Sequence, residues 1–316
     1  MKKILITPRS YGFFDEGQIL KQFDPNQFEI LREIGPFREN ELAERLKGVH
    51  AAIVGTDQVT KKVLEAADQL ELIVKYGVGL DNIDLEFAKE KGIKVENTPG
   101  VNTEAVADYT FGLLLSLARQ IHISDMEIRQ GLWKKRTGTE IYQKTIGILG
   151  LGAIGKSIAR RAYGFNMKIL AYDLYQDKSF ANQFEVTYCE LEEIIEQSDV
   201  ICIHLPLNNE TKHLINKNSL AKMKPNTFII NTARGGIIDE KAIYEAIKEK
   251  RIAGAAIDVF EEEPLKNSPL AELENIILTP HNASASEEAT QRMTTQTTDK
   301  VLRFYQGRGE LIGNLH

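Results

Sequence analysis

The stretch Ile146-Gly147-Ile148-Leu149-Gly150-Leu151-Gly152-Ala153-Ile154-Gly155 decides the fold class of this chain. It begins as a short apolar strand, carries glycines at the spacing Gly-x-Gly-x-x-Gly, and continues as an amphipathic helix pattern. Such glycines permit a tight turn, allow the backbone to approach a pyrophosphate, and let helix and strand pack closely. The helix N-terminus adds N–H donors and the positive end of a dipole. We therefore expect a dinucleotide at Gly150, Gly152, Ala153, Ile154 and Gly155.

The next expected strand, residues 168–172, is followed directly by Asp173. A carboxylate at this position would accept hydrogen bonds from both adenosine ribose hydroxyls and would repel a 2′-phosphate. No arginine follows immediately to offset that repulsion. These residues favour NAD over NADP, while a glycine turn that binds no ligand remains the alternative.

Apolar runs and amphipathic stretches alternate on both sides of the turn, which is the pattern of βα units and parallel sheets. Downstream we expect strands at 146–149, 168–172, 200–204, 228–231, 253–258 and 276–279. Upstream we expect strands at 4–7, 51–54, 72–75 and 93–95. A long helix after Asn102, apolar nearly all round, is expected at a domain junction or subunit interface. Ser284 and Glu287 predict a capping box that opens a final helix.

Composition argues against several classes of protein. The chain has 316 residues and 42% hydrophobic residues, which predicts a globular protein of about two domains. Its 39 Lys and Arg against 45 Asp and Glu lack the basic excess of a nucleic-acid binder. The basic cluster at 134–136 is interpreted as a solvated loop.

No apolar run approaches the roughly 18 residues that span a bilayer, and the N-terminal apolar run is too short for a signal peptide. We expect no membrane or nucleic-acid partner and a cytoplasmic location. Cys189 and Cys202 have no metal-ligand spacing, so no metal site is expected.

A second glycine loop, Gly77-Val78-Gly79, follows the expected strand at 72–75. Successive backbone N–H groups at the carboxyl end of a strand can form a nest for a small carboxylate or phosphate. The alternative is a plain turn.

Three chemically versatile side chains follow three consecutive expected strands. Arg234 follows 228–231, Glu263 follows 253–258, and His281 follows 276–279. Ligands of open α/β sheets bind beyond the carboxyl ends of the strands, so these residues could meet in one crevice. A salt bridge, an exposed acidic run and a structural histidine are the alternatives.

Together these motifs resemble the D-isomer-specific 2-hydroxyacid dehydrogenase family over nearly the whole chain. The chain is most similar to the D-3-phosphoglycerate dehydrogenase branch, in a short form without a regulatory domain. The segments that carry the resemblance are 77–84, 97–100, 150–155, 204–207, 231–239, 258–265 and 280–281.

The resemblance implies two Rossmann-like domains. One is a doubly wound parallel-sheet NAD domain at 102–284. The other is a smaller, flavodoxin-like substrate domain, discontinuous at 1–101 plus 285–316. A homodimer built on the NAD domain is also implied.

The resemblance further implies a role for each motif residue in hydride transfer between nicotinamide C4 and C2 of a D-2-hydroxy acid. His281 would be the acid/base, Glu263 would hold its imidazole, and Arg234 would bind the substrate carboxylate. The Gly77–Gly79 amides would bind that same carboxylate. Residues implied to join the nucleotide site are Leu205, Pro206, Thr232, Ala233, Arg234 and Asp258.

The substrate is less clearly indicated. Phosphoglycerate dehydrogenases of the family usually carry an Arg-Ser pair where this chain has Gly55-Thr56. Arg9 and Ser10, after the first expected strand, are a possible substitute for binding the far end of the substrate. The expectation is 3-phosphoglycerate, with glyoxylate or hydroxypyruvate reduction as the alternative. An NAD-sensing, corepressor-like binding protein is an alternative of another class.

Overall fold

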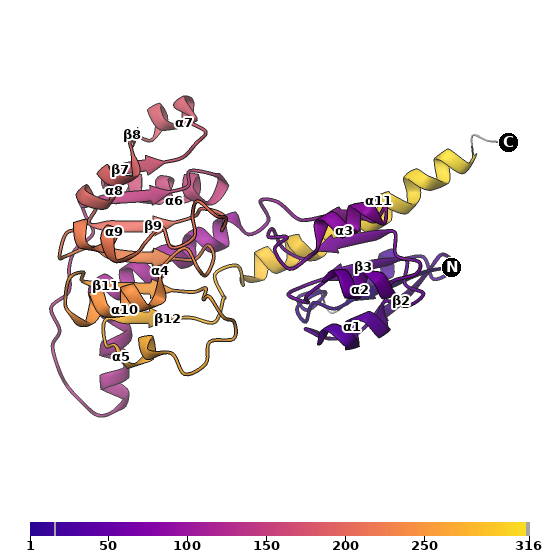
Figure 1. Cartoon of the computed structure of the whole chain (residues 1–316), viewed down its shortest axis with the longest axis horizontal. Coiled ribbons are helices and arrows are strands. Elements are labelled where there is room, and N and C mark those ends of the chain that lie inside the picture. The colour runs from indigo at the N-terminus through magenta and orange to yellow at the C-terminus, as the bar shows by residue number, and fades with distance from the viewer. Residues whose placement is uncertain (16, 314–316) are drawn as a thin grey trace. The chain divides into compact units, whose positions relative to one another are not determined.

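In the computed structural model, which describes residues 1–15 and 17–313, the chain divides into two units (Figure 1). Unit 1 comprises Met1–Asn102 and Ala285–His316, and unit 2 comprises Thr103–Ser284. The sequence places the corresponding boundaries after residues 101 and 284. The assignment of unit 1 to the substrate stays a prediction.

Unit 2 contains a seven-stranded, fully parallel sheet in the order β12-β11-β10-β9-β6-β7-β8. Its strands are β6 (Thr145–Leu149), β7 (Lys168–Tyr172), β8 (Val186–Tyr188), β9 (Val200–Ile203), β10 (Phe228–Asn231), β11 (Gly254–Ile257) and β12 (Ile276–Leu278). The strand order reverses between β6 and β9, which is the switch point of a doubly wound nucleotide-binding sheet. The expected fold class is therefore confirmed.

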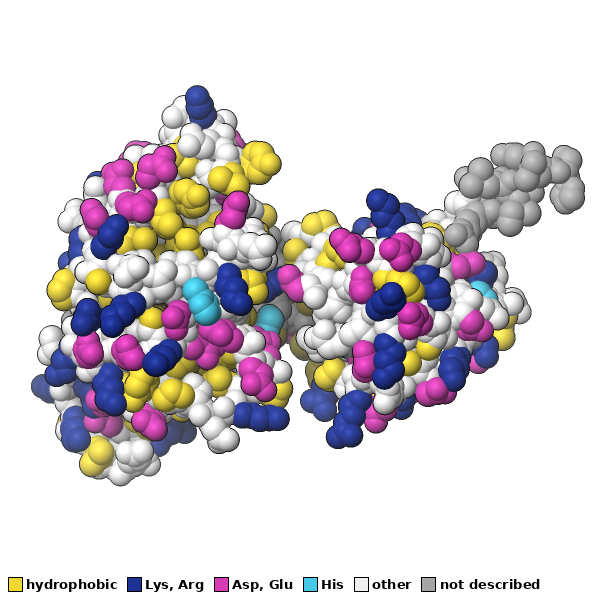
Figure 2. All heavy atoms as spheres, viewed as in Figure 1, with side chains coloured by type: hydrophobic (Ala, Val, Ile, Leu, Met, Phe, Trp, Pro, Cys, Tyr) yellow, Lys and Arg dark blue, Asp and Glu magenta, His cyan; other side chains and the backbone are white. Residues whose placement is uncertain are grey.

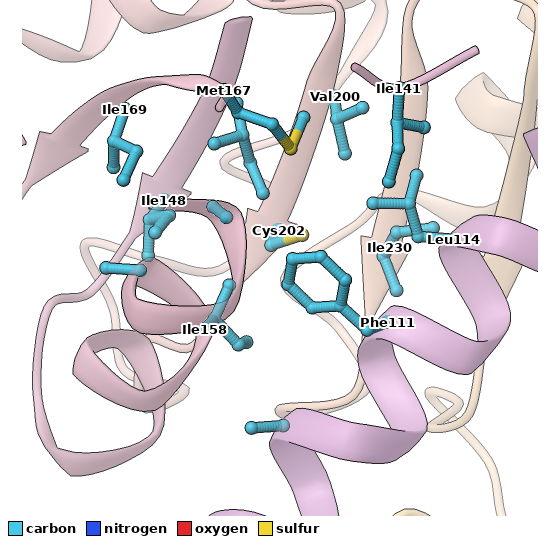
Figure 3. Close-up of a cluster of buried hydrophobic side chains, with 14 of the residues drawn as sticks. Phe111, Leu114, Ile141, Ile148, Ile158, Met167, Ile169, Val200, Cys202 and Ile230 are labelled. Carbon is cyan, nitrogen blue, oxygen red and sulfur yellow. The ribbon is translucent and has the colours of Figure 1, made fainter. Parts of the chain in front are cut away.

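Helices cover both faces of this sheet. They are α4 (Thr103–Arg119), α5 (Ile121–Arg129), α6 (Ala153–Gly164), α7 (Lys178–Gln183), α8 (Leu191–Gln197), α9 (Lys217–Lys222) and α10 (Glu240–Lys248), with a 3-10 turn η2 (Pro269–Glu272). Figure 3 shows Phe111 and Leu114 of α4 pointing into the apolar cluster that also contains Cys202 and Ile158. Cys202 is fully buried there, as a strand residue of the core.

Unit 1 has a five-stranded parallel sheet in the order β2-β1-β3-β4-β5, which is the flavodoxin-like order. The strands are β1 (Lys2–Ile6), β2 (Phe28–Arg32), β3 (Ala51–Val54), β4 (Leu72–Lys75) and β5 (Lys94–Glu96). The helices are η1 (Gln18–Gln22), α1 (Glu39–Arg45), α2 (Lys61–Ala66), α3 (Leu85–Glu90) and α11 (Glu287–Gly313). Met293 and Val301 of α11 pack with Ile4 and Val74 of the sheet.

The structure corrects the expected start of the last helix. Ser286, not Ser284, caps it, because the Ser286 hydroxyl accepts the Ala289 N–H at 3.1 Å. The residues just before Ser284 are held elsewhere, since the N–H groups of Asn282 and Ala283 donate to the Asp258 carboxylate. The helix therefore begins with a serine N-cap in place of the predicted capping box, because Ala289, at the third helical position, has no side-chain acceptor.

The basic cluster at 134–136 is engaged in ion pairs. Arg136 forms two 2.9 Å hydrogen bonds with the buried Glu127 carboxylate and one of 2.8 Å with Glu274. Lys134 lies 3.6 Å from Glu127. On the face drawn in Figure 2, acidic and basic side chains are interspersed over each unit. Within the described ranges, no helix combines the length and apolar character needed to cross a bilayer.

Candidate active site

The glycine turn of unit 2 is shaped by close backbone contacts. Gly150 has φ +96°, and a Cβ there would lie 2.6 Å from the His204 carbonyl oxygen. A Cβ on Gly155 would lie 2.1 Å from the Gly150 carbonyl oxygen. Both positions therefore exclude any side chain, as the sequence pattern predicts.

The start of α6 fits the pyrophosphate of a dinucleotide. Its N-cap is Gly152, so no side chain hydrogen-bonds the N–H groups of its first turn. A Cβ on Gly152 would meet no atom of the described residues within 4 Å. Ala153 and Ile154 follow as the first helical residues. An uncapped helix N-terminus beside open space is suited to an anionic phosphate.

Asp173 lies at the carboxyl end of β7, beside this turn. Its Oδ2 accepts the Leu151 N–H at 2.7 Å, and its Oδ1 accepts the Tyr175 N–H at 2.8 Å. Each carboxylate oxygen has further lone-pair capacity, so ribose hydroxyls remain possible partners.

His204 directly follows β9 and precedes the expected cofactor residues Leu205 and Pro206. Both ring nitrogens of His204 are buried, and neither has a hydrogen-bond partner among the described residues. Burial lowers the pKa of His204 to about 3. The Thr211 hydroxyl donates to the Pro206 carbonyl at 2.6 Å and holds that loop.

The loop after β10 is stabilised by its own polar groups. Asn231 brackets it, since its Oδ1 accepts the Ala233 N–H at 3.1 Å and its Nδ2 donates to the Arg234 carbonyl at 2.9 Å. Thr232 shares a 2.9 Å hydrogen bond with Thr110 of α4. The Arg234 guanidinium donates to the Ala233 carbonyl at 2.7 Å.

The structure brings Glu263 and His281 together. His281 Nδ1 lies 2.8 Å from Glu263 Oε2, and Glu263 Oε1 accepts the Phe260 N–H at 3.1 Å. Partial burial raises the pKa of Glu263, but the hydrogen bond and charge of His281, the Phe260 N–H and the charge of Arg234 outweigh it, so the pKa lies below its ordinary value. The loops after β10, β11 and β12 thus carry an electrostatically coupled Arg-Glu-His set.

Asp258 has a role that sequence reasoning missed. It is fully buried, and its carboxylate accepts the Thr279 hydroxyl at 2.5 Å and the N–H groups of Asn282 and Ala283 at 2.8 and 2.9 Å. Its carbonyl accepts the His281 N–H at 2.8 Å. Asp258 therefore shapes the loop that presents His281, at φ +52°. Thr279, two residues before His281, was the one sequence signal, since its hydroxyl is a donor for a buried carboxylate.

The expected substrate residues of unit 1 lie in two loops, one after β4 and one after β1. The Gly77 N–H is already hydrogen-bonded, to Thr98 Oγ1 at 3.1 Å and to the Lys75 carbonyl at 3.0 Å. The Gly77 N–H is therefore engaged within the fold, and carboxylate binding by the N–H groups of Val78 and Gly79 stays a prediction. Arg9 is exposed and Ser10 half-buried in the loop after β1. Their role in substrate binding stays a prediction.

Comparisons with known proteins point to one family. The family model described as the NAD binding domain of D-isomer specific 2-hydroxyacid dehydrogenases matches residues 111–283. A glyoxylate reductase of Korarchaeum cryptofilum is 41% identical over 92% of this chain and 89% of that protein. A D-3-phosphoglycerate dehydrogenase of Methanocaldococcus jannaschii is 42% identical over 91% of this chain and 56% of that protein.

A solved structure agrees with this likeness. The D-lactate dehydrogenase of Aquifex aeolicus, complexed with NAD and lactic acid, matches with a TM-score of 0.83. It is 28% identical and covers 99% of this chain and 98% of its own. Among the residues that the structure describes, no three His, Cys, Asp or Glu side chains are grouped to hold a metal.

Proposed function

Because the chain belongs to the D-isomer specific 2-hydroxyacid dehydrogenase family, we propose that it reduces small 2-keto acids of the glyoxylate and hydroxypyruvate class with NADH. The observation that carries this proposal is the 2.8 Å Glu263–His281 hydrogen bond, formed by loops that follow β11 and β12. An imidazole held by a carboxylate can supply the proton that a keto group needs to become an alcohol.

The reaction divides between the bound cofactor and the side chains. NADH, when bound, supplies a hydride from nicotinamide C4. Because Nδ1 of His281 is hydrogen-bonded to Glu263, the other ring nitrogen, Nε2, gives its proton to the C2 oxygen. The ionised Glu263 favours the imidazolium that precedes this transfer. Arg234 binds the substrate carboxylate with its planar fork.

Asp173 supports NAD as the preferred dinucleotide. Its carboxylate stands at the end of β7, next to the open N-terminus of α6, where a ribose 2′-phosphate would meet a like charge. The preference predicts a higher kcat/KM with NADH than with NADPH.

The relatives favour the smaller substrates. Most of the named relatives are glyoxylate or hydroxypyruvate reductases, including those of Korarchaeum cryptofilum and Thermotoga maritima. 3-Phosphoglycerate is the second candidate, because Arg9 offers an exposed guanidinium in the loop after β1. In this proposal Arg9 and Ser10 contact the far end of the substrate, and Val78 and Gly79 contact its carboxylate.

NADH fluorescence tests the proposal. The chain is incubated with glyoxylate, hydroxypyruvate, 3-phosphohydroxypyruvate and pyruvate, and NADH loss is followed over time. We expect turnover with glyoxylate or hydroxypyruvate. NADH binding without turnover of any keto acid would instead support the NAD-sensing, corepressor-like alternative.

His281→Ala tests the acid/base role. We expect kcat to fall by about 10²–10⁴-fold, the usual contribution of a proton-transfer group. NADH binding, measured by fluorescence titration, should stay close to that of the wild type. Turnover equal to that of the wild type would remove His281 from the mechanism.

We also propose that the chain forms a homodimer through unit 2. Support comes from apolar side chains exposed on α5 and just after it, which we call the α5 patch. Its members, with their exposed fractions, are Ile121 (55%), Met126 (48%), Ile128 (53%), Leu132 (38%) and Trp133 (88%). A second copy of the chain is the expected occupant of such a patch.

A further inference from the structure

Helix α11 buries a row of hydroxyl side chains inside unit 1. Thr290, Thr294 and Thr298 recur every four residues, and each is at most 6% exposed. Residues four apart lie on one face of a helix, so the three form a stripe. A helix usually buries apolar side chains on such a face, and buried hydroxyls need hydrogen-bond partners. The Thr294 and Thr298 hydroxyls have partners in two loops of the same unit, and Thr290 takes part through its backbone carbonyl.

Thr294 is the centre of a directed hydrogen-bond chain. The Tyr76 hydroxyl donates to the Thr290 carbonyl at 3.1 Å, so in its 2.9 Å contact with Thr294 its oxygen accepts the threonine proton. Thr294 Oγ1 in turn accepts the Gly12 N–H at 3.4 Å. The Thr294 hydroxyl therefore joins the backbone of the loop after β1 to the side chain of Tyr76, the residue that directly follows β4.

A parallel contact reinforces the first loop. Thr298 Oγ1 donates to the Thr294 carbonyl at 2.8 Å, so the Tyr11 hydroxyl is the donor in its 2.5 Å contact with Thr298. Burial raises the pKa of Tyr11 to about 12. Burial also raises the pKa of Tyr76, against the opposing hydrogen bonds of Thr294 and Ser10. Both phenols therefore remain neutral donors at ordinary pH.

The two tyrosines flank the expected substrate residues. Tyr11 directly follows Ser10, and Tyr76 directly precedes Gly77. From the other side, Arg32 Nη2 donates to the carbonyls of Pro8 at 2.6 Å and Arg9 at 3.1 Å. The backbone that carries Arg9 is thus fixed on two sides, while the Arg9 side chain is exposed.

We propose that Thr294 is a positioning residue that sets the spacing between the two substrate-binding loops. The loop with Val78 and Gly79 takes the carboxylate, and the loop with Arg9 and Ser10 takes a polar or anionic group on C3. The inference rests on the proposed function, in which both loops contact substrate. The spacing between the loops should therefore matter for acids that carry such a group on C3. A two-carbon acid contacts only one loop and does not sense the spacing.

The test compares a two-ended ligand with a one-ended ligand in four proteins. Inhibition constants of 3-phosphoglycerate and glycolate against glyoxylate reduction are measured for the wild type, Thr294→Val, Thr294→Ser and Thr297→Val. Thr297 is a matched control, because its buried hydroxyl donates only within α11, to the carbonyls of Met293 at 2.8 Å and Thr294 at 3.1 Å.

We expect Thr294→Val to raise the inhibition constant of 3-phosphoglycerate about tenfold, as for the loss of one or two hydrogen bonds. The inhibition constant of glycolate should change less than about twofold. Thr294→Ser keeps the hydroxyl and should retain the wild-type ratio of the two constants. Thr297→Val should retain that ratio even if it lowers the melting temperature. Tyr76→Phe, a second variant, should reproduce Thr294→Val.

Two results overturn the inference, and Arg9→Ala separates them. If the wild type binds the two ligands equally and Arg9→Ala changes neither, the far-end subsite of the proposed function fails, and the inference fails with it. If Arg9→Ala alters the ratio but Thr294→Val matches Thr297→Val, the loops bind substrate and only the positioning role of Thr294 is wrong.

Discussion

At the scale of single residues, the carboxylates of Asp173 and Asp258 bind backbone N–H groups, besides any ligand that they bind. Asp173 accepts one N–H from the glycine turn and one from the loop after β7, and Asp258 accepts two from the residues that follow His281. The motifs assign both residues to the nucleotide, and that assignment stays a prediction. A motif cannot identify the amides that a side chain holds, because these depend on how the surrounding loop folds.

Glu263→Gln tests how much the negative charge beside His281 contributes. Glutamine can still accept the Nδ1 hydrogen bond, but it cannot stabilise the imidazolium by charge. We expect kcat for keto-acid reduction to fall by about 10- to 100-fold. The measurement is keto-acid reduction followed by NADH loss. A kcat equal to that of the wild type would show that Glu263 acts on His281 through its hydrogen bond alone, without a contribution from its charge.

The buried His204 should make the folded protein less stable in acid. Its pKa is lowered to about 3 by burial, whereas an exposed histidine titrates near 6.5. As the pH falls below about 6.5, His204 binds a proton in the unfolded chain but not in the folded chain. The free energy of unfolding therefore falls by up to about 1.4 kcal/mol per pH unit. Urea unfolding at several pH values should give a shallower dependence for His204→Asn. An identical dependence in both proteins would contradict the prediction.

At the scale of elements, the expected strands at 51–54, 72–75, 168–172 and 228–231 coincide with β3, β4, β7 and β10. All four are fully or largely buried runs, whose hydrophobicity marks both ends. The strands not predicted, β2 and β8, are edge strands with half-exposed residues. Their pairing depends on a neighbouring strand rather than on their own pattern, so the sequence signal is weak.

The buried Tyr11, which is hydrogen-bonded to Thr298 of α11, should make unit 1 less stable at alkaline pH. The Tyr11 pKa is raised to about 12, so the unfolded chain ionises near pH 10 while the folded chain does not. Stability from this residue is complete below pH 10 and falls by roughly 2–3 kcal/mol as the pH rises to about 12. Tyr11→Phe should reduce this part of the pH dependence in urea unfolding. A Tyr11→Phe curve parallel to that of the wild type between pH 10 and 12 would contradict the assignment.

At the scale of the whole molecule, the sequence predicts best those parts of the site that lie at one edge of one sheet. Glu263 and His281 follow neighbouring parallel strands, so their meeting follows from topology alone. The hydrogen bond from the Gly77 N–H to Thr98 does not follow from topology, because it joins segments 21 residues apart and depends on side-chain geometry. General rules predict which loops form a site, and local hydrogen bonds decide which of their atoms are available.

The α5 patch gives a prediction for assembly. Trp133 is 88% exposed and Ile128 is 53% exposed, and burying both against a second copy would remove a large apolar area from water. We expect a dimer in sedimentation velocity and a monomer for the double variant Ile128→Asp with Trp133→Ala. Phe13→Ala is the matched control, because Phe13 is 70% exposed on unit 1 and lies outside the patch, so its removal should leave the dimer intact. A dimer that survives the double variant would place the contact on another surface, since an aspartate within an apolar interface is strongly destabilising.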